Sequence, residues 1–143
     1  MKQGFWFAYG RRERLAPLER LTSGLANDHS LSWRSEAPDL LVVTVHDSLT
    51  SNVADVVIGI NSAPHVALEA RELADAYRAG LIPLDPGVPP PDEGALAQAD
   101  ARIEMSWDLR FSDETYNTMA VIAGLLAETS GAVVYDVTNH RFV

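Results

Sequence analysis

Four histidines and a set of carboxylates are the side chains of this sequence that could catalyse a reaction or bind a metal. The histidines are His29, His46, His65 and His140, and none of them stands in a metal-binding spacing. His46 precedes Asp47, but adjacent residues of a strand point to opposite faces, so one site would not receive both unless the turn intervenes. There is no serine in a nucleophile elbow and no cysteine. We therefore expect no catalytic residue, no metal and no cofactor.

A pair of carboxylates, Glu104 and Asp108, lies in the stretch 101–111, where apolar and polar residues alternate strictly. The alternation predicts a strand with one face in the core and the other in water. A rise of about 3.3 Å per residue separates the two carboxylates by about 13 Å, which is too far for the pair of a glycosidase. Arg102 and Arg110 share their face, so we expect a solvated ladder of ion pairs or a surface that binds a partner.

Acidic residues outnumber basic ones, 20 against 11, which gives the 143-residue chain a formal net charge of −9. Residues 1–34 carry six basic and three acidic side chains, whereas residues 35–143 carry five basic and seventeen acidic ones. Such a chain repels nucleic acid and favours a basic protein partner. An exposed tryptophan near Arg34 would anchor such an interface. The candidate partner-binding residues are Asp85, Asp92, Glu93, Glu104, Asp108 and Trp33.

The bulk composition is that of one ordinary globular domain, with 47% hydrophobic and 22% charged residues. We predict a single α+β domain over residues 1–143. The lack of cysteine excludes disulfide scaffolds and zinc ribbons and suits a cytoplasmic protein. We find no signal peptide and no apolar window long enough to span a membrane.

The elements that must position these residues follow from hydrophobic patterning. Strands are predicted at 4–10, 31–35, 40–45, 53–60, 101–111 and 132–135, and residues 139–143 extend or return the last one. The first of these strands is apolar on both faces, so it is expected inside the sheet. We predict a mixed, largely antiparallel sheet of five to six strands, with two or three helices packed on one face.

Helices are predicted where apolar residues recur at helical spacing. One begins at Leu15 or Ala16 and ends at Asn27, and a second runs from Pro64 to Gly80. A third follows Ser112 and is apolar almost all round, so we expect it to be well buried. Between the second helix and the long strand, residues 81–94 hold five of the eight prolines and predict an exposed loop.

The segment from Leu126 to Asp136 ends a helix in Thr-Ser-Gly and continues as the strand Val-Val-Tyr-Asp. In this it resembles small bacterial α+β proteins, some of which are immunity proteins of polymorphic toxin systems. The resemblance implies a small soluble binder that blocks a toxin. It carries over no catalytic residue.

These observations favour a non-enzymatic cytosolic binding protein, an immunity-type inhibitor that occludes a basic toxin such as a nuclease through an acidic surface. Two alternatives stay open. One is a small enzyme or ligand-binding domain with a site near the ends of the central strands, where His46, Asp47 and Arg11 are the candidates. The other is a structural or phage-assembly component that associates with copies of itself.

Overall fold

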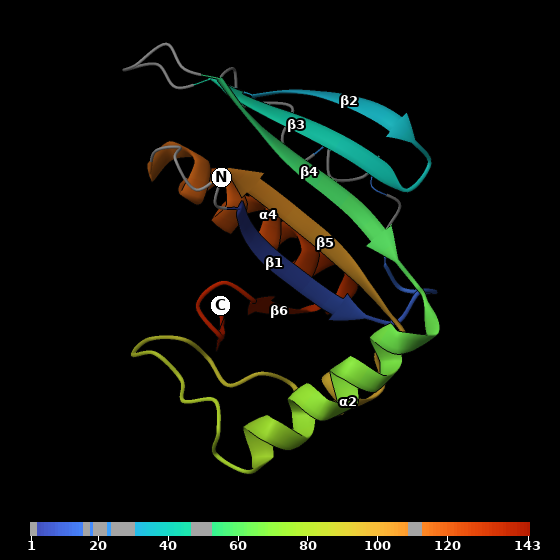
Figure 1. Ribbon diagram of the computed structural model, residues 1–143, viewed down its shortest axis with the longest axis vertical. Helices are drawn as coiled ribbons and strands as arrows, with labels where there is room; N and C mark the ends of the chain where they lie inside the picture. Colours follow the sequence, from blue (N-terminus) through green and yellow to red (C-terminus); the bar gives the residue numbers. More distant parts are fainter. Residues whose placement is uncertain (1–2, 16–17, 19–22, 24–30, 47–52, 109–112) are drawn as a thin grey trace.

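A seven-stranded open sheet forms the centre of the computed structural model, which describes residues 3–15, 18, 23, 31–46, 53–108 and 113–143 (Figure 1). Its strand order is β2-β3-β4-β5-β1-β6-β7, and every described pair is antiparallel. The strands are β1 (Gln3–Gly10), β2 (Leu31–Ala37), β3 (Leu40–His46), β4 (Val53–Asn61), β5 (Ala101–Asp108), β6 (Val133–Asp136) and β7 (Arg141–Phe142). The α+β class is thus confirmed, with seven strands in place of five to six because the returning end of the chain forms its own short strand.

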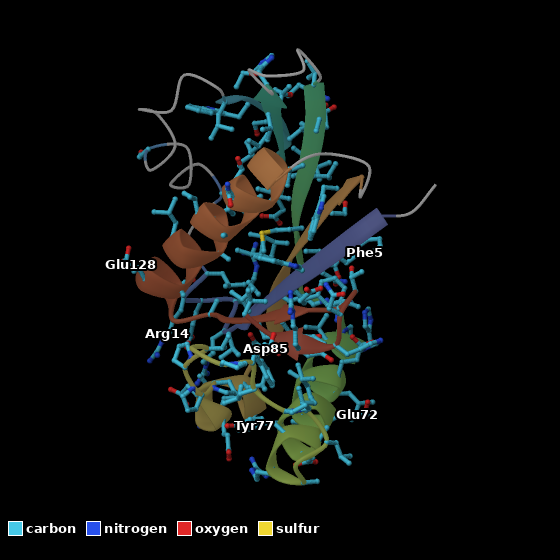
Figure 2. All side chains as sticks on the ribbon, turned by 90° about the vertical axis from the view of Figure 1, so that its left-hand side faces the viewer. Phe5, Arg14, Glu72, Tyr77, Asp85 and Glu128 are labelled. Carbon is cyan, nitrogen blue, oxygen red and sulfur yellow. The ribbon has the colours of Figure 1, made fainter. Side chains whose placement is uncertain are left out.

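Helices cover both faces of this sheet, which corrects the expectation that they pack on one. The described helices are α2 (Pro64–Arg78), α3 (Glu93–Ala97) and α4 (Asp113–Ser130). Figure 2 shows α4 on one side of the sheet and α2 on the other. The reason lies in β1, whose Trp6 and Ala8 point to the face that α4 covers while Phe7 and Tyr9 point to the opposite face. Both faces are apolar there, so both need a cover.

The larger core lies between the sheet and α4. Ile122 and Ala123 of α4 pack there with the apolar residues of the central strands, and Leu15 and Leu18 join them. Trp6 and Trp107 meet edge to face with their ring centroids 5.8 Å apart. Trp107 belongs to the apolar face of the alternating stretch 101–111, which was predicted to lie in the core. Apart from these few positions, the helix predicted up to Asn27 falls outside the described residues.

Only one side of α4 is buried, although its sequence is apolar almost all round. Ile122 is fully buried, whereas Val121 is 54% exposed and Gly124 is also exposed. The expected burial of the whole helix is wrong, because α4 forms an outer layer and no described element packs against its far side. None of the described helices is long and apolar enough to cross a membrane.

The smaller core lies on the opposite face, which we call the α2 face. Val66, Ala70 and Ala74 of α2 pack there with Leu96 of α3 over the sheet residue Tyr9. These helices cover the end of the sheet at which β1 and β4 finish. Farther along the same face the strand residues remain accessible to solvent.

The proline-rich segment between α2 and α3 is held at two points. Ile82 is buried in the smaller core, and Arg141 Nη1 lies 2.9 Å from Asp85 Oδ2. Gly87, at a φ of 84°, makes the intervening turn. The predicted loop over 81–94 ends slightly earlier than expected, because α3 begins at Glu93.

Candidate functional site

A buried arginine organises the covered end of the α2 face. The Arg102 side chain is 7% exposed. Its Nε donates a hydrogen bond to Glu104 Oε2 at 2.7 Å. Its Nη1 donates to the Tyr9 hydroxyl at 3.2 Å and also to Glu69 Oε2. The guanidinium carbon lies 3.9 Å from the centroid of the Phe7 ring, which is a cation–π contact. We call these five residues the Arg102 cluster.

Strand register brings the cluster together. Tyr9 and Asn61 lie opposite Arg102 on the two strands that flank β5, and residues that face each other across a sheet point to the same side. Asn61 Oδ1 accepts from the N–H of Ala63 at 3.0 Å, and Asn61 Nδ2 donates to Glu104 Oε2 at 3.0 Å. Asn61 therefore ties the start of α2 to the cluster, and α2 in turn supplies Glu69.

Two members of the cluster, Arg102 and Tyr9, have raised pKa values. Burial lowers the pKa of Arg102, but hydrogen bonds to Glu104 and Glu69 outweigh it and leave the pKa above its ordinary value. Burial raises the pKa of Tyr9 although Arg102 pulls it down, so this phenol is neutral at physiological pH. One guanidinium between two carboxylates gives the cluster one unit of excess negative charge.

Two hollows flank the Arg102 cluster on the α2 face. The sheet hollow, of about 210 Å³, lies over the strands where Gly59 has no side chain; it is lined by Phe5, Phe7, Leu40, Val57, Gly59, Glu104 and Ser106. The helix hollow, of about 420 Å³, lies between α2 and β6; it is lined by Tyr9, Glu69, Glu72, Leu73, Ala76, Leu81, Ile82, Tyr135 and His140. The Arg102 cluster lies between the two hollows: Phe7 and Glu104 line the sheet hollow, and Tyr9 and Glu69 line the helix hollow.

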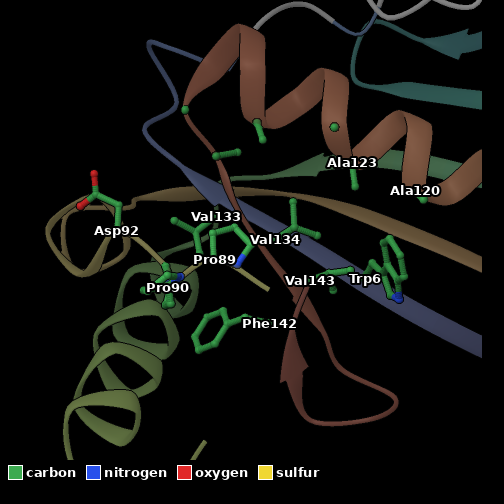
Figure 3. Close-up of a pocket in the computed structure, with 15 residues that line it drawn as sticks. Trp6, Pro89, Pro90, Asp92, Ala120, Ala123, Val133, Val134, Phe142 and Val143 are labelled. Atoms are coloured by element: carbon green, nitrogen blue, oxygen red, sulfur yellow. The ribbon is translucent and has the colours of Figure 1, made fainter. Parts of the chain in front are cut away.

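A third and larger cavity, of about 510 Å³, lies against α4 (Figure 3). The proline run 89–91 and the end of the chain form one wall, while small residues of α4 such as Ala123 and Gly124 form another. Trp6 lies at one end, and Asp92 is the charged residue among its lining. Its lining is otherwise apolar, so it offers few groups that could orient a ligand.

Four of the five acidic residues predicted to bind a partner make ion pairs or hydrogen bonds within the fold. Asp85 pairs with Arg141 at 2.9 Å, and Glu93 Oε2 lies 3.1 Å from Arg78 Nε. Asp92 caps α3, where its side chain accepts from a backbone N–H. These three belong to the proline-rich segment and α3, whereas Glu104 belongs to the Arg102 cluster. The sequence therefore placed in one group residues that lie in two separate parts of the molecule.

Trp33 and Asp108 complete the predicted set. Trp33 is 36% exposed, as its polar neighbours suggested. It lies opposite the core residue Val43, so it points to the face that α4 covers and away from Glu104. Asp108 is the last residue of β5, and its side chain is outside the described part of the chain.

The candidates for an enzymatic site do not meet. Arg11 follows β1 at the end of the sheet where Asn61 lies, and it pairs with Glu13 at 3.2 Å. His46 ends β3 at the opposite end of the sheet, where its Nε2 is 3.3 Å from the hydroxyl of Ser32. Asp47 lies outside the described residues.

No family model, curated protein or solved structure matches the chain. Within the described ranges, no three His, Asp or Glu side chains gather closely enough to hold a metal ion. The function is therefore inferred from the molecule's own geometry, and above all from the α2 face.

Proposed function

We propose that the chain is a non-enzymatic binding protein of the immunity type, which occludes a basic protein such as a nuclease toxin. The binding surface is the uncovered part of the α2 face, which we call the open surface. It comprises Phe5, Leu40, Asp55, Val57, Glu104 and Ser106. The observation that carries the proposal is the exposure of Phe5 and Val57, each 37% accessible, on the part of the α2 face that no described helix covers.

The open surface has the composition of a protein interface. Such interfaces have an apolar centre with aromatic anchors and a polar rim. Phe5 and Val57 lie on either side of Ser106 in one row across the sheet, beside the sheet hollow. Asp55, which accepts a 2.8 Å hydrogen bond from Thr44, stands farther along β4 toward the opposite end of the sheet from Glu104. A partner side chain that enters the hollow would thus have carboxylates on both sides.

Charge favours a basic partner at this surface. The net charge of −9 attracts a cationic protein from a distance, which speeds association. Glu104 is held by Arg102 and Asn61, so its carboxylate loses little freedom when a partner binds. The carboxylates of the proline-rich segment, Asp85, Asp92 and Glu93, contribute to the long-range attraction.

A pull-down from the native organism at moderate salt tests the proposal. The bait is compared with the double variant Phe5→Ser/Val57→Ser and with Val121→Ser, which removes a more exposed valine, 54% accessible, from the opposite face. We expect one stoichiometric basic protein with the wild type and with Val121→Ser, and at least about a tenfold loss with the double variant. Equal recovery by all three baits would refute the open surface as the binding site.

Charge-reversal variants distinguish long-range electrostatic attraction of the partner from direct contact with it. Glu104→Lys is expected to speed dissociation of the captured partner, because it places a cation within the interface. Asp92→Lys/Glu93→Lys is expected to slow association mainly, with an effect that fades at high salt. Unchanged binding after reversal of all three positions would remove the electrostatic basis of the proposal.

A further inference from the structure

The helix hollow between α2 and β6 differs in chemistry from the open surface. Two tyrosines, two glutamates and one histidine, His140, line it, together with apolar groups of α2 such as Leu73. Glu69 and Glu72 stand three positions apart, so they lie on one side of the helix. Tyr9 and Tyr135 come from neighbouring strands of the sheet beneath. The hollow is thus walled by carboxylates on one side and aromatic rings on the other.

The fold neutralises the carboxylates of the hollow only in part. Glu72 makes no hydrogen bond or ion pair with any described residue. Glu69 gives one oxygen, Oε2, to Arg102, and Arg102 is also shared with Glu104. Two glutamates therefore face the hollow, while the nearby guanidinium is already divided between two partners.

The wall already binds a cation that belongs to the chain itself. The Arg102 guanidinium contacts the Tyr9 hydroxyl and the Glu69 carboxylate, and its central carbon lies 5.7 Å from the centroid of the Tyr9 ring. Both Tyr9 and Glu69 also line the hollow. Two groups that line the hollow, Tyr9 and Glu69, therefore already contact an organic cation, the Arg102 guanidinium.

We propose that the helix hollow binds an organic cation, an alkylammonium or guanidinium group, with its charge at Glu72 and Glu69 and its carbon chain against Tyr135 and Leu73. Carboxylates supply the opposite charge, and aromatic faces favour cations and alkyl chains alike. The cation comes either from a free amine or from a lysine or arginine side chain of a protein. This site is separate from the open surface, so it does not depend on the proposed function.

Calorimetric titration of the full chain with matched ligands tests the proposal. The lysine probe is N-acetyl-lysine methylamide, and its neutral counterpart is N-acetyl-norleucine methylamide, which keeps all four side-chain carbons and lacks the ammonium. We expect the lysine probe to bind with a Kd of about a millimolar, as suits an open site, and the norleucine probe not to bind. Equal binding of both probes, or no binding of either, would overturn the proposal.

Two isosteric variants decide whether the charge acts locally. Glu72→Gln removes the unpaired carboxylate of the hollow, whereas Glu128→Gln removes a carboxylate from α4 on the other side of the sheet (Figure 2). We expect Glu72→Gln to weaken the lysine probe roughly three- to fivefold and Glu128→Gln to leave it unchanged. Equal weakening by both variants would mean that the net charge alone attracts the probe, which contradicts the proposal.

Cadaverine, a free diamine, distinguishes the two sources of the cation. Tighter binding of cadaverine than of the lysine probe assigns the hollow to a free amine. Tighter binding of the lysine probe assigns it to a side chain of a protein. In either case the affinity must fall in Glu72→Gln, and an affinity that does not fall would place the ligand elsewhere.

Discussion

Two arginines on the α2 face of the sheet each pair with two carboxylates, but one arginine is buried and the other is exposed to water. Arg102 pairs with Glu69 and Glu104 and its side chain is 7% exposed. Arg34 pairs with Glu36 at 2.6 Å and with Asp55 at 3.9 Å, and its side chain is 57% exposed. The difference comes from what covers them, since α2 and aromatic rings pack around Arg102 whereas β2 is an edge strand. The two arginines, each with two carboxylate partners, are therefore expected to differ widely in their contribution to stability.

The largest expected effect follows from Arg102→Leu. This variant leaves Tyr9 without its hydrogen-bond donor and Glu69 and Glu104 beside each other without a counter-charge. We expect a loss of about 3 kcal/mol in the free energy of unfolding, at the low end for a broken buried pair because both carboxylates reach water. Urea denaturation followed by circular dichroism measures it. If Arg34→Met lost as much free energy of unfolding as Arg102→Leu, burial would not explain the difference between the two arginines.

A smaller effect is expected from Glu104→Gln. The amide oxygen still accepts from Arg102 and Asn61, but two charge-assisted hydrogen bonds become neutral at the acceptor. We expect a loss of about 1 kcal/mol in the free energy of unfolding. Denaturation in the same buffer measures it, with Glu128→Gln as the control for the change in net charge. An unchanged stability would show that Glu104 is not held by the cluster.

The pH dependence of stability sharpens the comparison through Tyr9. Burial raises the pKa of Tyr9 in the folded chain, so the folded state keeps this proton at a pH where the unfolded chain begins to lose it. The resulting stabilisation is complete below the unfolded value near 10 and is lost as pH rises through the folded pKa. We expect Tyr9→Phe to lose less stability than the wild type between pH 8 and pH 11. Parallel curves for the two proteins would contradict the burial of this phenol.

The smallest expected effect is that of Arg34→Met. The guanidinium of Arg34 reaches water, where salt screens its ion pairs. The side chain also loses conformational entropy when it forms these pairs, which offsets their attraction. We expect a melting temperature equal to that of the wild type within error, by calorimetry at low and at moderate salt. A drop comparable to that of Arg102→Leu would show that exposure does not separate the two sites.

Local patterning predicted much of this fold. The alternation over 101–111 predicted a strand with one face in the core, and β5 places Met105 and Trp107 there, while residues 109–111 lie outside the described residues. The two apolar faces of β1 predicted its place inside the sheet. The exposure of Trp33 followed from its polar neighbours. Each of these properties depends on residues next to one another in the chain, so a single sequence contains them.

The candidate sites depend on contacts that local patterning does not contain. Alternation placed Arg102 on the non-core face, where a solvated ladder was expected. Its burial comes from Glu69 and Tyr9, which lie 33 and 93 positions away along the chain. The isolated glycine of β4, Gly59, was the one local signal of a hollow, since a glycine within a strand leaves room beside its neighbours. The side of the sheet on which each helix packs depends on tertiary structure in the same way.

Side-chain footprinting of the captured complex tests whether the open surface is the surface that the partner covers. Hydroxyl radicals modify exposed side chains, and protection at a residue shows that a partner covers it. We expect strong protection of Phe5 and Val57 in the complex and no protection of Val121 on α4. Protection of Val121 with Phe5 still reactive would place the partner on the opposite face and contradict the open surface as the binding site.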